Sequence, residues 1–195
     1  MNYILIGCLL GISAAITPGP LTALIIAQTI KGSLKNGIMV ALSPIFSDLL
    51  IAPVIMLILA KIPEKITNIL SVIGGMVVIF YGISTIYRRH IETKPTSTQS
   101  LYKGILINIS NPHPYIFWSA IAGPLTIKAY EISVILSISF IAAFYFVFIG
   151  LAIGLVYLVH KGKDLFHSKY YQYALIACGA FMIAIGVYLI FSGLT

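Results

Sequence analysis

The sequence predicts an all-α membrane protein with six transmembrane helices, arranged as two inverted-topology repeats of three helices each. Three observations support this prediction. The 195 residues are 59% hydrophobic and 9% charged, with a mean hydropathy of +1.04, whereas soluble domains carry about 25% charged residues. Six predominantly apolar runs each reach the length of about 20 residues that a membrane-spanning helix needs. One polar stretch divides the chain almost in half, with three runs on each side.

The six predicted helices follow one another through mostly short connections. Their periodicity is weak because the runs are apolar on all sides, as expected for helices surrounded by lipid. The runs cover residues 3–30, 37–60, 66–87, 104–127, 132–159 and 173–194.

Lysine and arginine residues set the predicted orientation. Nine of them lie in the connections after the first, third and fifth runs, three lie in the connections after the second and fourth, and both tails have none. Cytoplasmic loops of membrane proteins carry an excess of Lys and Arg. We therefore expect a multi-pass protein of the cytoplasmic membrane with both termini outside. The net charge of +7 follows from this topology, and we expect no nucleic-acid partner.

The polar stretch RRHIETKPTSTQSLY, residues 88–102, is the predicted linker between the repeats. It gives a first three-helix repeat over residues 1–87, a cytoplasmic linker over 88–102 and a second repeat over 103–195, within one integral membrane domain. Because each half has an odd number of helices, the halves insert with opposite orientation, as in inverted-repeat transporters.

Two proline-containing breaks interrupt the first and fourth runs. The first run contains TPGP at residues 17–20, and the fourth contains NPHP at residues 111–114. Proline inside a helix costs about 3 kcal/mol, and the freed backbone groups must be buried in protein or line a polar cavity. Half-helix ends in such cavities bind charged substrate groups. The predicted binding residues at the breaks are Thr17, Pro18, Gly19, Pro20, Asn108, Asn111, Pro112 and His113.

Asp48 is the only acidic residue well inside any run. An ionisable group at such depth costs at least about 2.5 kcal/mol and usually faces a cavity or a partner. We expect Asp48 to carry a coupling proton or to bind a substrate ammonium group. The alternative is a neutral acid bonded to Ser47. His113 is the only histidine inside a run, so it is either a titrating partner of Asp48 or a packed neutral imidazole.

Two glycine pairs show the spacing of close helix packing in membranes. Gly7 and Gly11 lie in the first run, and Gly150 and Gly154 lie in the fifth. We expect both pairs to mark helix contacts and not a substrate site.

The sequence predicts neither enzyme chemistry nor a cofactor. No catalytic signature such as GxSxG or HExxH is present. Cys8 and Cys178 both lie in apolar runs and give no disulfide framework and no metal-ligand spacing. We interpret them as packing residues, and we expect no metal site.

At this point the motifs resemble those of a known family. The segment GISAAITPGP at residues 11–20 resembles the first-helix hallmark of the LysE/RhtB amino-acid exporters. Asp48 stands where that family has a Gly-Asp pair, with Ser47 here in place of glycine. The segment 111–113, followed by the aromatic pair at 117–118, resembles the family's Asn-Pro-Lys segment, with His113 in place of lysine.

The resemblance implies export of amino acids or related small metabolites through the lipid bilayer, driven by the proton motive force. A conditionally charged His113 implies a different substrate preference or pH dependence from a lysine. An ion or metal transporter on the same superfamily scaffold is the main alternative. A thiol-based membrane oxidoreductase and a non-transporting interaction protein are two others. The sequence leaves the substrate, the coupling stoichiometry, the transport direction and the oligomeric state open.

Overall fold

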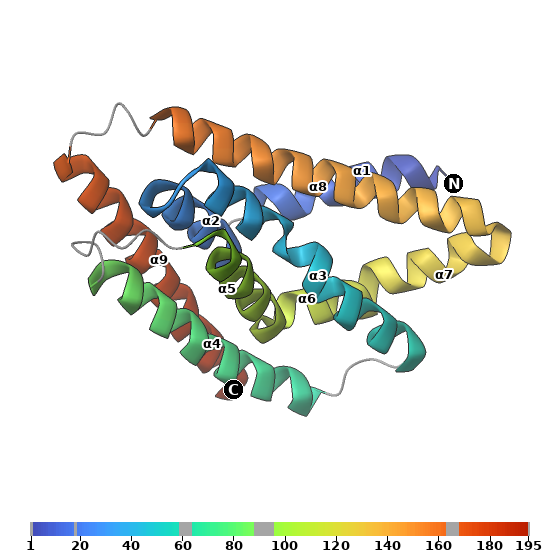
Figure 1. Cartoon of the computed structure of the whole chain (residues 1–195). Helices are drawn as coiled ribbons and strands as arrows, with labels where there is room; N and C mark the ends of the chain where they lie inside the picture. Colours follow the sequence, from blue (N-terminus) through green and yellow to red (C-terminus); the bar gives the residue numbers. More distant parts are fainter. Residues whose placement is uncertain (1, 18, 59–63, 88–95, 163–167, 195) are drawn as a thin grey trace.

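The computed structural model describes residues 2–17, 19–58, 64–87, 96–162 and 168–194. Within these residues all regular structure is helical, and no strand occurs. Helix α8 lies along one edge of an elongated bundle, and helices α4 and α9 form the opposite side (Figure 1). The prediction of an all-α fold is confirmed for the described residues.

The first predicted helix is two helices, α1 (Tyr3–Ile16) and α2 (Pro20–Lys31), bent by 66° at the TPGP break. At the end of α1, the backbone N–H and the hydroxyl of Thr17 both donate to the carbonyl of Ser13. α2 begins with Pro20, whose missing N–H is tolerated at the first helical position. No side chain caps this N-terminus. The break is therefore real, although Pro18 itself lies outside the described residues.

Helix α3 (Leu34–Ile58) continues through two internal prolines, Pro44 and Pro53. Pro44 has no N–H to donate to the carbonyl of Val40, one turn earlier. The hydroxyl of Ser43 donates to this carbonyl at 2.7 Å. A serine beside the proline thus satisfies the freed group, which lets the helix stay continuous.

The fourth predicted helix is divided further than expected. α5 (Ser97–Ser110) ends at Asn111, α6 (Pro112–Phe117) follows at once, and a π-helical turn, η2 (Trp118–Ala122), leads into α7 (Gly123–Ile132). The expected break at the NPHP segment is present. The π-helical turn has no counterpart in the prediction.

Side chains satisfy the backbone groups that the second break releases. Asn111 accepts from the N–H of His113 through its side chain, and its own N–H donates to the carbonyl of Asn108. The hydroxyl of Tyr115 donates to the carbonyl of Ile109 at 2.9 Å. Such local partners are what a break in an apolar environment requires.

The linker is shorter than predicted at its C-terminal end. Thr96 and Gln99 form a capping box that starts α5 at Ser97, so residues 97–102 are helical. Reciprocal side-chain bonds of this kind satisfy two orphan donors of a helix start. Residues 88–95 of the predicted linker lie outside the described residues.

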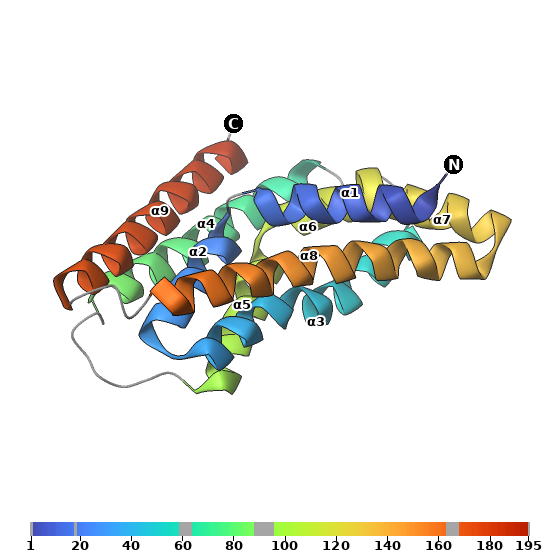
Figure 2. The same ribbon diagram turned by 90° about the horizontal axis from the view of Figure 1, so that it is seen from above.

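Helices α4 (Glu64–Tyr87) and α9 (Ser168–Leu194) pack closely in opposite directions. A Cβ atom on Gly75 would lie 2.5 Å from the carbonyl oxygen of Gly186, and one on Gly82 would lie 2.7 Å from that of Gly179. These contacts are reciprocal, so the two helices meet backbone to backbone at two points. Figure 2 shows the pair side by side.

Two further pairs run in the same direction. α1 lies along α8 (Val134–Gly162), with Gly7 against the carbonyl of Phe140 and Gly11 against that of Phe144. α5 lies along α3, with Gly104 against Ser43. Exchanging the first three predicted helices with the last three turns one pair into the other, and the inverted repeat itself stays a prediction.

The glycine prediction is half right. Gly7 and Gly11 mark a helix contact, as expected. Gly150 and Gly154 do not, because a Cβ atom at either position would meet open space. Both lie on the exposed face of α8. Spacing alone could not distinguish a packed glycine pair from one that faces outward.

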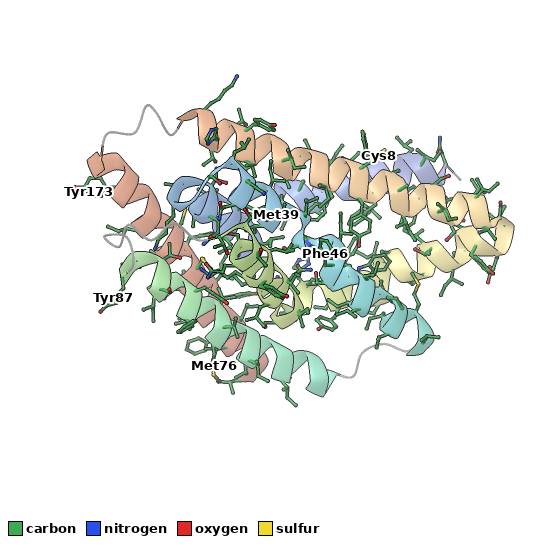
Figure 3. The ribbon with its side chains drawn as sticks, viewed as in Figure 1. Cys8, Met39, Phe46, Met76, Tyr87 and Tyr173 are labelled. Carbon is green, nitrogen blue, oxygen red and sulfur yellow. The ribbon has the colours of Figure 1, made fainter. Side chains whose placement is uncertain are left out.

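By length and composition, α3 over Leu34–Leu57 and α8 over Val134–Gly162 can each cross a membrane, and the bent α1–α2 pair can form a third span. The apolar parts of α4 and α9 are shorter, Val72–Tyr87 and Ile176–Phe191. Six spans thus stay a prediction. Large apolar side chains such as Met76 and Tyr87 point away from the bundle (Figure 3), as expected for a protein surrounded by lipid.

Candidate functional site

Asp48 lies in the middle of α3, with 7% of its surface exposed. Its Oδ1 accepts a hydrogen bond from Nδ2 of Asn108 at 3.2 Å, and its Oδ2 accepts one from the hydroxyl of Tyr145 at 2.8 Å. No charged group is among the described partners of this carboxyl group. The carboxyl group therefore depends on neutral donors from α5 and α8.

Asn108 joins α5 to α3 twice. Besides its bond to Asp48, its Nδ2 donates to the hydroxyl of Ser47 at 2.6 Å. The Ser47 hydroxyl lies within 3.2 Å of the carbonyls of Ser43 and Pro44. Ser47 thus helps to orient the amide that contacts Asp48, and it does not itself bond to the carboxyl group.

Two aromatic residues at this site were not predicted as site residues. Tyr145 comes from α8 and bonds to Asp48 directly. Trp118 begins the π-helical turn, is 2% exposed, and lies beside the Asp48 carboxyl group. Its Nε1–H nevertheless makes no hydrogen bond of good geometry to any described group. Leaving a buried donor unsatisfied costs about 1–3 kcal/mol.

Aromatic contacts hold the two sides of the site together. The ring of Phe117 stacks on Phe144, with centroids 5.1 Å apart, and Phe144 meets Tyr145 edge to face at 5.0 Å. Trp118 packs among apolar residues of α3, including Ile51 and Ile55. These contacts connect the segment after the second break with α8 and α3, so a displacement of one wall would disturb the others.

The structure brings together only some of the predicted residues. Asp48 and Asn108 are in contact, and Asn111 and Pro112 form the break that follows Asn108. His113 is exposed and forms no ion pair with Asp48, so the expected pairing of these two groups is absent. Among the described residues of the first break, which exclude Pro18, none forms a hydrogen bond to Asp48.

A second buried polar cluster lies nearer the α2–α3 connection. The hydroxyl of Ser100 donates to Oε1 of Gln28 at 2.9 Å, and Nδ2 of Asn36 donates to the Ser100 hydroxyl at 2.8 Å. Ser33 donates to Oδ1 of Asn36 at 2.6 Å. Together with the Asp48 site, this Gln28–Asn36–Ser100 cluster makes the α3–α5 contact polar at two levels.

Candidate metal ligands are few in the part of the chain that the structure describes. That part contains no group of three His, Cys, Asp or Glu side chains able to hold a metal ion. Cys8 and Cys178 are both unpaired and partly buried. Cys8 lies on α1 (Figure 3), whereas Cys178 lies on α9.

The chain matches the family model of the LysE type translocators over residues 12–193 of 195. No curated protein and no solved structure matches it. The matched region includes both breaks, Asp48, Asn108, Trp118 and Tyr145. A match of this extent, on an all-helical fold with exposed apolar faces, leads to one conclusion. The protein belongs to the LysE type translocator family and is a membrane transport protein for small molecules.

Proposed function

We propose that this protein exports amino acids or related small metabolites, driven by the proton motive force. The observation that carries the proposal is the buried carboxyl group of Asp48, which has only neutral partners and is bonded to α5 and α8. A carboxylate in such surroundings is costly unless it is paired or fully hydrogen-bonded. A cation, either a proton or a substrate ammonium group, is the natural complement to it.

Competition between these two cations would couple transport to the proton gradient. Ionised Asp48 binds the ammonium group of a cytoplasmic substrate. On the outer side, a proton binds to the same carboxyl group and replaces the substrate. The protonated, neutral group then returns and releases its proton inside. One site thus exchanges one proton for one substrate without further ionisable groups.

The packing of the helices supports alternating access between two halves. Asp48 belongs to the first predicted half, whereas Asn108 and Tyr145 belong to the second. Rocking of one half against the other would change both bonds. The parallel pairs α1–α8 and α3–α5, and the antiparallel pair α4–α9, are the relations that an inverted repeat of six spans requires.

The two breaks have different roles in the proposed transport route. Asn108 bonds to Asp48, Asn111 and Pro112 form the break between Asn108 and Trp118, and the exposed His113 follows at the start of α6. Thr17, Gly19 and Pro20, the described residues of the first break, form a second part of the proposed route, because the N-terminus of α2 has no side-chain cap and such ends favour anions. They act apart from Asp48.

The distribution of basic residues supports the proposed orientation. Figure 1 shows the α2–α3 connection, the end of α8 and the start of α9 at the same end of the bundle. Lys31 and Lys35 lie in the first of these regions, and His160 and Lys161 in the second. We assign this end to the cytoplasm, which places both termini outside.

The deciding experiment is efflux from cells preloaded with a panel of labelled amino acids, with and without an uncoupler. The variants are Asp48→Asn and Asp48→Ala. Glu131→Gln serves as the matched control, because Glu131 is an exposed acid on α7. We expect saturable, uncoupler-sensitive efflux that both Asp48 variants lose and Glu131→Gln keeps.

Two results would contradict parts of the proposal. Full export by Asp48→Asn with none by Asp48→Ala would exclude a proton-carrying role, because an amide can hydrogen-bond but cannot exchange the proton. No efflux of any amino acid by a folded wild-type protein would favour the ion or metal transporter, which uptake of labelled divalent cations would then test.

A further inference from the structure

The indole N–H of Trp118 is the one fully buried side-chain polar atom without a hydrogen bond in the described parts of the chain. Three polar side chains of the same site have hydrogen-bond partners. Tyr115 donates to Ile109, Tyr145 to Asp48, and Asn108 to both Ser47 and Asp48. The nearest acceptor is the Asp48 carboxyl group, which lies beside this N–H without good hydrogen-bond geometry, so an acceptor bound next to Asp48 would satisfy the donor.

The backbone fixes the position of this donor. Trp118 opens the π-helical turn, in which the N–H of Gly123 bonds to the carbonyl of Trp118. A Cβ atom on Gly123 would overlap that carbonyl, so glycine permits the turn. Single π-helical turns are costly and frequently occur at functional sites. α3 contacts both α6 and this turn, and Trp118 lies beside the Asp48 carboxyl group.

Trp118 and Asp48 therefore present a donor and an acceptor side by side. Each oxygen of the Asp48 carboxyl group accepts one described hydrogen bond and can accept another. The remaining surroundings, which include Ile51, Ala52 and Ala122, are apolar. A ligand that satisfies both groups needs a strong donor and a strong acceptor on adjacent atoms.

We infer that the site binds the head group of an α-amino acid, with the ammonium group on Asp48 and the carboxylate on the Nε1–H of Trp118. This inference rests on the proposed function and deepens it by naming the group that recognises the carboxylate. In this arrangement the substrate's ammonium group lies between the Asp48 carboxylate and the substrate's own carboxylate, so it separates the two negative charges. Simple amines and inorganic cations satisfy Asp48 but leave Trp118 unpaired, so the site discriminates against them.

The chain offers a direct readout, because Trp118 is its only tryptophan. Intrinsic indole fluorescence of the purified full-length protein in detergent reports on this site alone. The probes are each exported amino acid, its methyl ester and its decarboxylated amine. We expect the free amino acid to change the fluorescence saturably, at a concentration about tenfold lower than either analogue, since a hydrogen bond to a charged group is worth that much or more.

Two variants distinguish the role of the Trp118 N–H from the role of its indole ring. Replacing Trp118 with the benzothienyl analogue of tryptophan keeps the shape and removes only the N–H, and Trp118→Phe removes both. In counterflow into proteoliposomes, both variants should need about tenfold more of the free amino acid, and the preference for the free acid over its ester should fall to near unity. The benzothienyl variant keeps the test decisive if Trp118→Phe does not fold.

The possible results are distinct. Equal potency of acid and ester in the wild type, or an unchanged preference in the benzothienyl variant, would overturn the inference while leaving amino-acid export intact. If the benzothienyl variant lost transport of the acid, the ester and the amine equally, Trp118 would act only through Asp48. That result would also overturn the inference. No transport and no fluorescence change with any amino acid would refute the proposed function and the inference together.

Discussion

The hydroxyl of Tyr145 donates to Oδ2 of Asp48 at 2.8 Å, joining residues 97 positions apart in the sequence. Tyr145 lies on α8 and Asp48 on α3, and the Tyr145 ring is held edge to face against Phe144. Asn108 of α5 binds the other carboxyl oxygen. Asp48 is therefore the point at which three helices of the bundle meet through polar side chains.

Tyr145→Phe should lower export by about tenfold or more, because a hydrogen bond to a charged group contributes about 1.5–3 kcal/mol. The substitution keeps the ring and removes only the donor to Asp48. Initial efflux rates, normalised to the amount of folded protein in the membrane, provide the measurement. Tyr157→Phe on the exposed face of α8 is the matched control, and equal rates for both variants would contradict a role for the Tyr145 bond.

The sequence predicted the helices well because proline and charge are strong local signals. The six apolar runs correspond to described helices, and both proline-containing breaks are present. Pro44 and Pro53 do not break α3. For Pro44, the Ser43 hydroxyl supplies the missing donor, a compensation visible only in three dimensions. The π-helical turn was not predictable either, because its bond from the N–H of Gly123 to the carbonyl of Trp118 follows from no periodic pattern in the sequence.

The site was predicted only in part, for a related reason. Asp48 stood out as a charge in an apolar run, and Asn108 as an amide next to a break. Tyr145 did not stand out, because tyrosine is common in membrane helices and its partner is 97 positions away. The Gln28–Asn36–Ser100 cluster was missed because its bonds join residues 64 and 72 positions apart. Long-range polar pairs leave no trace in a single sequence.

Gly74→Ala should destabilise the protein strongly. A Cβ atom on Gly74 would overlap the carbonyl of Ser110, so α4 would have to move away from the second break. Overpacking of this kind costs about 1–3 kcal/mol. Thermal unfolding of the purified protein in detergent would show a lower midpoint, together with reduced export.

The matched control for this substitution is Gly150→Ala on α8. A Cβ atom there meets open space, and alanine favours a helix over glycine by about 1 kcal/mol. Gly150→Ala should therefore leave the unfolding midpoint unchanged or raise it. A lower midpoint for Gly150→Ala would indicate that this glycine face is covered by another chain.

Ser100→Val should destabilise the contact of α5 with α2 and α3. It removes the hydrogen bonds that the Ser100 hydroxyl makes with Oε1 of Gln28 and Nδ2 of Asn36, and each buried hydrogen bond contributes about 1 kcal/mol. Thr98→Val, at an exposed position in the same helix, controls for the replacement of a hydroxyl group by an apolar one. Similar thermal midpoints for the two variants would contradict a stabilising role for the cluster.

His113 and Asn108 should differ sharply in their importance to transport, although both stand near the second break. Asn108→Leu removes the amide that bonds to Asp48 and Ser47, and it should lower export by about tenfold or more. His113→Gln removes an exposed imidazole without a bond to Asp48, and its effect should stay within about twofold, as for surface substitutions. Efflux measured across a range of external pH values would test both. If His113→Gln changed the pH profile as much as Asn108→Leu changed the rate, His113 would have to reach Asp48 in another conformation of the transport cycle.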